Sequence, residues 1–85
     1  MKGGTTVNNQ PDIVFIIWER NANDRRSPRR IVQATVIGSA NPCRNLLERN
    51  DRFSRAQSCL LENAFVREFQ EVVGNFGVSV FVRRS

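Results

Sequence analysis

Four arginines within six residues are the densest chemistry in the chain: Arg25, Arg26, Arg29 and Arg30. Arg25 and Arg26 lie in a polar segment, residues 19–28, and Arg29 and Arg30 follow it. This segment joins two apolar, β-branched runs, which predicts a β-hairpin with a cationic tip. Guanidinium groups suit phosphate and carboxylate, and β-ribbons enter DNA grooves. We interpret the tip as a contact for nucleic acid. An acidic protein partner and a solvated loop are the alternatives.

Two further arginines, Arg83 and Arg84, follow the last apolar run and extend the same basic set. If that run is antiparallel to the first strand, however, its end lies opposite the tip. Trp18 is the aromatic residue near the loop, and its apolar run predicts a place in the core. That scarcity of exposed aromatics argues against a platform for single-stranded nucleic acid, which needs stacking surfaces.

A second candidate site, for an anion, is the junction after the second apolar run, comprising Gly38, Ser39, Asn41, Cys43 and Arg44. Free backbone N–H groups at a helix start bind anions, and a thiol in the first turn has a lowered pKa. Cys43 and Arg49 have the Cys-x5-Arg spacing of phosphatase loops, but no glycine lies between them. A structural role for Cys43 is therefore the preferred interpretation.

The composition nominates no enzyme, metal site or cofactor. The chain has no histidine, which removes the commonest general base, and its two cysteines, Cys43 and Cys59, lack the spacing of metal ligands. These cysteines form one possible bridge if the helical segments around them pack together. The polar segment 1–10 is no signal sequence, and no apolar stretch could span a bilayer. We therefore expect a cytoplasmic protein with reduced thiols and no membrane partner.

The net charge is +5, and all basic residues except Lys2 are arginines. Codon bias explains the scattered arginines as well as recognition does, but the positive balance favours an anionic partner. The 85 residues allow one small domain. We assign a flexible arm to residues 1–11 and an α+β domain to residues 12–85.

Three strands and one main helix are predicted. The uninterrupted apolar run Ile13–Trp18 is typical of a central strand, residues 31–37 alternate as a strand with one wetter face, and residues 78–84 form the last strand. Between them, apolar positions from residue 61 to residue 76 recur at helical intervals. They predict a helix that starts at Ser54 and ends near Gly74.

The order ββαβ predicts a three-stranded antiparallel sheet, order 2-1-3, with the helix on one face. One helix covers only one face, so the apolar first strand needs a second cover. The candidates are a partner subunit or the irregular segment near residue 40. This predicts a homo-oligomer. It also gives the alternative function: a protein-interaction module that binds through an apolar sheet face with arginines at its rim.

Overall fold

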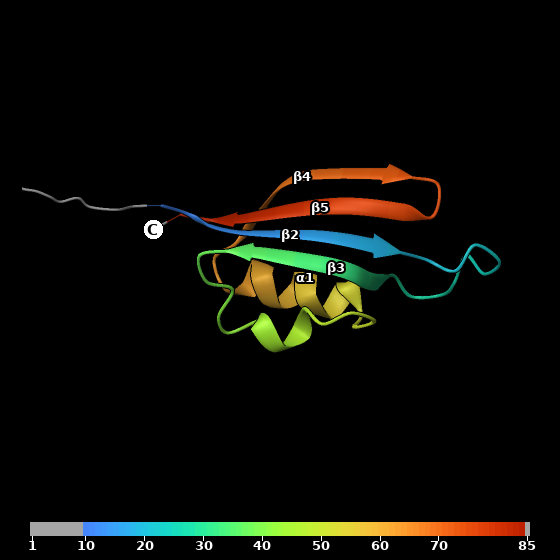
Figure 1. Cartoon of the computed structure of the whole chain (residues 1–85), viewed down its shortest axis with the longest axis horizontal. Helices are drawn as coiled ribbons and strands as arrows, with labels where there is room; N and C mark the ends of the chain where they lie inside the picture. Colours follow the sequence, from blue (N-terminus) through green and yellow to red (C-terminus); the bar gives the residue numbers. More distant parts are fainter. Residues whose placement is uncertain (1–9, 85) are drawn as a thin grey trace, which may run out of the picture.

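The computed structural model describes residues 10–84. Its elements are β2 (Asp12–Glu19), β3 (Arg30–Ile37), the short 3-10 helix η1 (Arg44–Leu46), α1 (Phe53–Glu62), β4 (Val66–Val73) and β5 (Phe76–Arg83). All but two residues of the predicted N-terminal arm, 1–11, lie outside the described residues. The four strands form one antiparallel sheet in the order β3-β2-β5-β4 (Figure 1).

The predicted α+β class is confirmed, and the three predicted strands lie in the predicted order with β2 between the other two. The prediction of three strands was wrong, because residues 66–73 form the edge strand β4 instead of continuing the helix. Ala64 has a φ of 71°, which breaks the helical path after α1. Gly74 has a φ of 60°, as the tight two-residue turns of β-hairpins require, and this turn joins β4 to β5.

The alternation of side chains along β2 divides the sheet into two faces. Val14, Ile16 and Trp18 are buried on the side of α1. The Trp18 ring lies directly over Gly77, where any Cβ would collide with it, and its Nε1 donates a hydrogen bond to Ser79 Oγ at 3.3 Å. Glycine at position 77 therefore lets a tryptophan pack flat against the neighbouring strand.

Helix α1 covers this side with one apolar stripe. Phe53, Ala56 and Leu60 are fully buried. The Phe53 ring lies 5.6 Å from that of Trp18 and 6.3 Å from that of Phe81. The helix begins at Phe53, one residue before the predicted start at Ser54, and no side chain caps its N-terminus.

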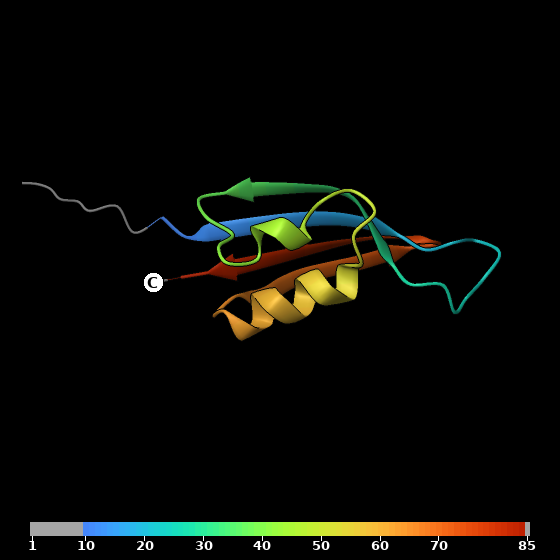
Figure 2. The same ribbon diagram turned by 90° about the horizontal axis from the view of Figure 1, so that it is seen from below.

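The irregular segment 38–52 packs on the same side as α1 (Figure 2). It contributes Ala40 and Cys43 to the core, so it does not cover the second face. That second face, here called the open sheet face, is set by the strand registers, which also place Gln33, Thr35 and Glu71 on it. Its apolar side chains are Ile13, Phe15, Ile17, Ile37, Val66, Phe69, Val73, Phe76, Val78, Val80 and Val82.

Two adjacent leucines on α1 test this assignment of the core. Leu60 is fully buried, whereas Leu61 is 49% exposed. We expect Leu60→Ala to lower the free energy of unfolding by about 2–5 kcal/mol, because it removes buried methyl groups and leaves a cavity. The matched control, Leu61→Ala, should change it by less than about 0.5 kcal/mol. Urea unfolding measures both, and equal losses would contradict the packing described.

Candidate anion-binding surface

The β2–β3 loop projects beyond the sheet at one end of the molecule (Figure 1). Its shape is held by side chains that accept backbone hydrogen bonds: Asn21 Oδ1 from Asn23 N at 2.9 Å, and Asp24 Oδ1 from Arg26 N at 2.9 Å. The side chains of Arg25 and Arg26 are exposed at this tip. The loop therefore presents two of the four clustered arginines to solvent.

The other two arginines of the cluster are bound to the body of the protein. The Arg29 guanidinium lies over the rings of Trp18 and Phe53, at 5.1 and 4.9 Å from their centres. Arg30 Nη1 donates a hydrogen bond to the carbonyl of Asn50 at 3.0 Å. Arg29 thus closes one end of the core by a cation–π contact, a role that the sequence did not reveal.

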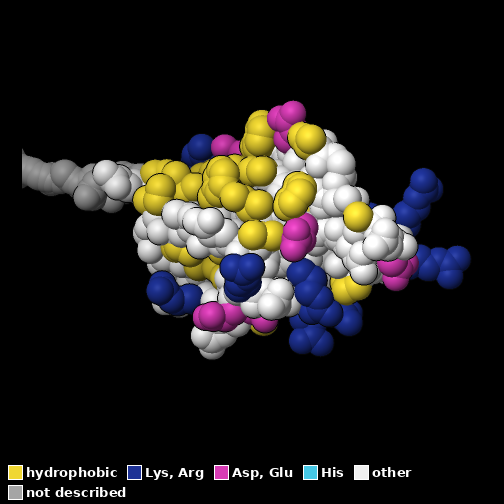
Figure 3. All heavy atoms as spheres, turned by 45° about the vertical axis from the view of Figure 1, so that its right-hand side comes forward, with side chains coloured by type: hydrophobic (Ala, Val, Ile, Leu, Met, Phe, Trp, Pro, Cys, Tyr) yellow, Lys and Arg dark blue, Asp and Glu magenta, His cyan; other side chains and the backbone are white. Residues whose placement is uncertain are grey.

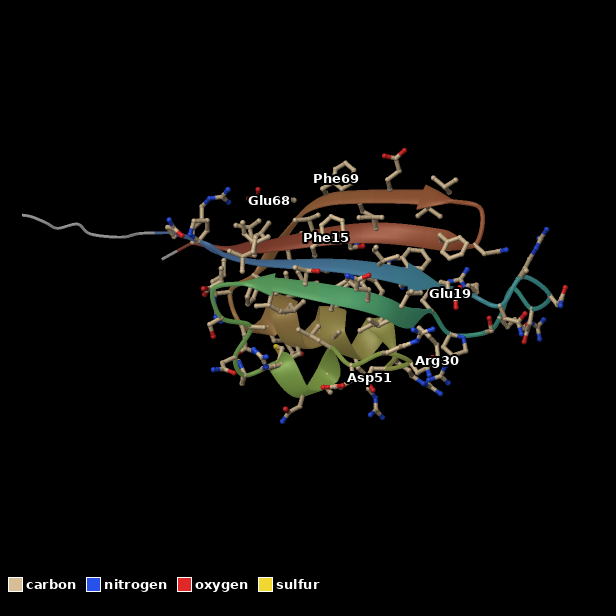
Figure 4. The ribbon with its side chains drawn as sticks, in the orientation of Figure 1. Phe15, Glu19, Arg30, Asp51, Glu68 and Phe69 are labelled. Atoms are coloured by element: carbon tan, nitrogen blue, oxygen red, sulfur yellow. A yellow bond between two sulfur atoms is a disulfide. The ribbon has the colours of Figure 1, made fainter. Side chains whose placement is uncertain are left out.

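Residues 50–53 fold back along the outer edge of β3. Ile31 N donates to Asp51 O at 2.9 Å, and Phe53 N donates to Arg29 O at 3.0 Å. This pairing sets Arg30 opposite Arg52. With Arg55, these two arginines line a cavity of about 340 Å³ that Asp51 also borders. Figure 4 shows Glu19, Arg30 and Asp51 at the end of the sheet that carries the loop.

Electrostatics show that the arginines near the tip crowd one another. The pKa of Arg29 is lowered, mainly by burial and then by the charges of Arg20 and Arg67. Arg67 Nη1 donates to Gln57 Oε1 at 3.0 Å, a neutral partner on α1. Arg67 itself lies opposite Phe81, towards the other end of the sheet, and its side chain extends over α1. We call the arginines of the tip end together with Arg67 the arginine surface, and its members are Arg20, Arg25, Arg26, Arg29, Arg30, Arg52, Arg55 and Arg67.

Within residues 10–84, the ion pairs are Arg83–Asp12 and Arg84–Glu68. Both lie at the end of the sheet away from the loop, because β5 runs antiparallel to β2. No arginine of the arginine surface has a carboxylate partner among the described residues. Glu19, Asp24 and Asp51 lie at the same end, but they are fewer than the arginines and form no ion pair with them, so positive charge is in excess there.

Arg83 and Arg84 do not join the tip, and each has a structural contact. Arg83 Nε donates to Asp12 Oδ2 at 2.9 Å, and its guanidinium lies 4.4 Å from the centre of the Phe65 ring. Its other nitrogens donate to the backbone carbonyls of Ser39, Asn41 and Asn63. Arg83 therefore ties the end of β5 to the junction segment.

The junction predicted to bind an anion already holds a carboxylate of the chain itself. Ser39 N donates to Asp12 Oδ1 at 2.9 Å, and Gly38, with a φ of 83°, lies so close that a Cβ there would collide with that oxygen. The expected helix start is only the three-residue η1, with Arg44 exposed at its beginning and Asn41 N bonded to Ser39 Oγ.

Cys43 and Cys59 form a disulfide that fastens the junction to α1. The prediction that the two could meet is confirmed, and the expectation of reduced thiols was wrong, because the packing of residues 40–46 on α1 brings the sulfurs together. Cys43 is fully buried and has no free thiol to react. Disulfides persist in oxidising compartments, so this bridge weighs against the cytoplasmic location expected from the sequence.

Within residues 10–84, no group of three or more histidine, cysteine or acidic residues could hold a metal ion. None of the helices described there is long and apolar enough to cross a membrane. Comparison of the chain with models of protein families, with curated proteins and with solved structures found no match. The surfaces described above are therefore the features of the protein that bear on its function.

The disulfide provides one test of how the junction is held. Replacing both cysteines, Cys43→Ala with Cys59→Ala, should lower the free energy of unfolding by about 3 kcal/mol, because the bridge closes a loop of about 16 residues in the unfolded chain. Urea unfolding with and without a thiol reductant measures this. The reductant should weaken the parent protein and leave the double variant unchanged. An effect on both would show that the reductant acts elsewhere.

The pH dependence of stability tests the Asp12 contacts. The pKa of Asp12 lies below its ordinary 3.8, first because Ser39 N–H donates to the carboxylate and then because Arg83 does. A lowered folded pKa means that the stabilisation is complete above pH 3.8 and is lost as the pH falls through the folded value.

We expect Asp12→Asn to be less stable than the parent at pH 7, with the difference shrinking as the pH falls below 3.8. Urea unfolding between pH 7 and pH 2 measures this. Glu68→Gln is the control. The hydrogen bond from Arg84 also lowers the pKa of Glu68, from 4.5, so this variant shows how much of the pH dependence a carboxylate at an exposed site produces. Parallel pH profiles for the parent and Asp12→Asn would contradict the assignment.

Proposed function

We propose that the protein is a non-enzymatic binding protein that holds an anionic polymer, preferentially nucleic acid, on its arginine surface. One observation carries this proposal: the eight arginines of the arginine surface have no carboxylate ion-pair partner in the described residues, while the ion pairs lie at the end of the sheet away from the loop. Phosphate oxygens would supply the missing negative charge, with release of the counterions condensed on the polymer.

The crowding around Arg29 supports an anion as the missing partner. Burial, and after it the charges of Arg20 and Arg67, disfavour its charged form and lower its pKa. A phosphate placed among the three would relieve that repulsion. The planar donors of arginine bind phosphate with two parallel hydrogen bonds, which a compact ammonium group does not offer.

The mode of contact is to the backbone of the polymer rather than to its bases. Trp18, the aromatic residue closest to the loop in sequence, is buried under Arg29. Among the exposed phenylalanines, Phe15 and Phe69 lie on the open sheet face (Figure 4), away from the helix side. Phe76 is the one exposed ring of the described chain that lines a cavity with Arg20 and Arg30, and one ring does not make a stacking platform for successive bases. Phosphate contacts carry no sequence information, so binding should depend on salt more than on sequence.

A protein-interaction module is the second candidate function, and the open sheet face supports it. Phe15, Phe69 and Phe76 are each about 40–50% exposed there. Contiguous exposed apolar surface marks interaction sites on soluble proteins. The two candidates use different surfaces, so a protein with both is physically consistent.

Fluorescence anisotropy with a short DNA duplex and a short RNA, at 50 and 200 mM salt, tests the first candidate. Arg25→Ala with Arg26→Ala, and Arg52→Ala with Arg55→Ala, should each weaken binding. Each pair should also reduce the slope of log affinity against log salt by about 2, one unit per lost phosphate contact.

The matched control is Arg44→Ala with Arg49→Ala, which removes the same charge from exposed positions beside β3. It should change the slope by much less than either test pair. Absence of binding at 50 mM salt, or equal loss in the control, would refute the arginine surface as the site. Polyglutamate that displaced the DNA at equal charge would assign the surface to an acidic protein instead.

A further inference from the structure

Six of the eight exposed large hydrophobic side chains of the described chain lie on the open sheet face. This face forms the hydrophobic area across the upper part of Figure 3, while Lys and Arg gather below it and on the projecting loop. Phe69 and Phe76 are about half exposed, and Val73 is 69% exposed. Burying these side chains would contribute about 25 cal/mol of hydrophobic free energy for each Å² of apolar area removed from water.

We propose that this face packs against the same face of a second copy of the chain, forming a symmetric dimer of two stacked four-stranded sheets. Stacked antiparallel sheets lie about 10 Å apart, with their strands inclined by about 30°. A two-fold axis makes each open sheet face its own partner. The proposal stands apart from nucleic-acid binding, since it uses the opposite side of the sheet from α1.

The exposed apolar area matches what a dimer of this kind needs. At about 200 Å² for a whole phenylalanine side chain, the exposed parts of Phe15, Phe69 and Phe76 provide about 280 Å². The exposed aliphatic side chains raise the total to roughly 500 Å² per copy. A standard interface buries about 800 Å² per partner, of which about 65% is apolar in homodimers.

The distribution of charge favours a second copy as the occupant. Charged groups on this side stand towards the rim: Glu19 and Arg30, which pair at the tip end of β2 and β3, and Glu71 on the edge strand β4. The positive charge that would drive two copies apart is concentrated beyond the tip and on the side of α1. Two copies can therefore meet face to face while their arginine surfaces point outward.

The sheet edges offer a competing arrangement, in which two β4 strands pair side by side. Residues 50–53 already cover part of the β3 edge, whereas β4 has no neighbour beyond it among the described strands. Edge pairing would leave the open sheet faces of both copies in water. Stacking buries them, so the hydrophobic term favours stacking.

The full chain should sediment and scatter light as a dimer at micromolar concentration. Phe15→Arg and Phe69→Arg place a charge inside the stacked interface, and each should weaken the dimer at least about 30-fold, as loss of a central interface anchor does. Both positions are partly exposed in the single chain, so the variants should keep the fold. Near-ultraviolet circular dichroism of buried Trp18 checks this.

Val72→Arg is the matched control. Val72 lies on the same strand as Phe69 and is 53% exposed, but it pairs with Gly77 and therefore faces the helix side. The dimer should survive this change. A parent protein that stays monomeric up to 100 μM would overturn the proposal, and so would a dimer that Val72→Arg disrupts as strongly as Phe69→Arg does. Neither outcome bears on the nucleic-acid titration, which fails through absence of binding at 50 mM salt or through equal loss in its control pair.

Discussion

A single ten-residue helix has to cover a sheet made of four eight-residue strands. At 1.5 Å per residue the helix is about 15 Å long, whereas each strand spans about 27 Å. The helix therefore covers only the middle of one face, leaving both ends of the core and the whole second face without cover. The organisation of the remaining chain follows from this shortage.

On the side of α1, the ends of the core are closed by irregular chain and by arginines. The disulfide holds residues 40–46 against the helix, and Arg83 lies over Phe65 at the same end as Asp12. At the opposite end Arg29 lies over Trp18 and Phe53. In both cases the guanidinium covers an aromatic ring while keeping access to water or hydrogen-bond acceptors, which an aliphatic side chain would not do.

The strands could be predicted because their pattern is local: an unbroken apolar run marks the central strand, and alternation marks its neighbour. Residues 66–73 misled the prediction because Phe69, Val72 and Val73 continue the helical intervals that begin at Leu61. The strand alternation is hidden, because Val66 and Phe69 reach the same face only through the bulge between Arg67 and Phe69. The deciding features were backbone angles at Ala64 and Gly74. Ala64 carried no sequence signal, and the glycine signal at Gly74 fits a helix end as well as a hairpin turn.

The candidate site was only half visible in the sequence for a different reason. Adjacent arginines such as Arg25 and Arg26 are recognised by proximity along the chain. Arg52 and Arg55 reach Arg30 only because residues 50–53 fold back on the β3 edge, a contact between segments about twenty residues apart. Spacing does not encode such a contact. Sequence spacing also did not reveal that the guanidinium groups of Arg29 and Arg83 pack on aromatic rings at the ends of the core.

Most of the arginine surface lies on the loop and on the side of α1, and only Arg30, opposite Glu19, stands at the rim of the open sheet face. Distance makes the functions of the two surfaces compatible. In a stacked dimer the two sheets are about 10 Å apart, and each helix layer lies about 10 Å further out. The helix layers are then roughly 30 Å apart, several times the Debye length of about 8 Å at physiological salt. Repulsion between the arginines of the two copies is therefore largely screened. Hydrophobic stacking does not depend on that screening, so salt that releases a polyanion leaves the sheet contact in place.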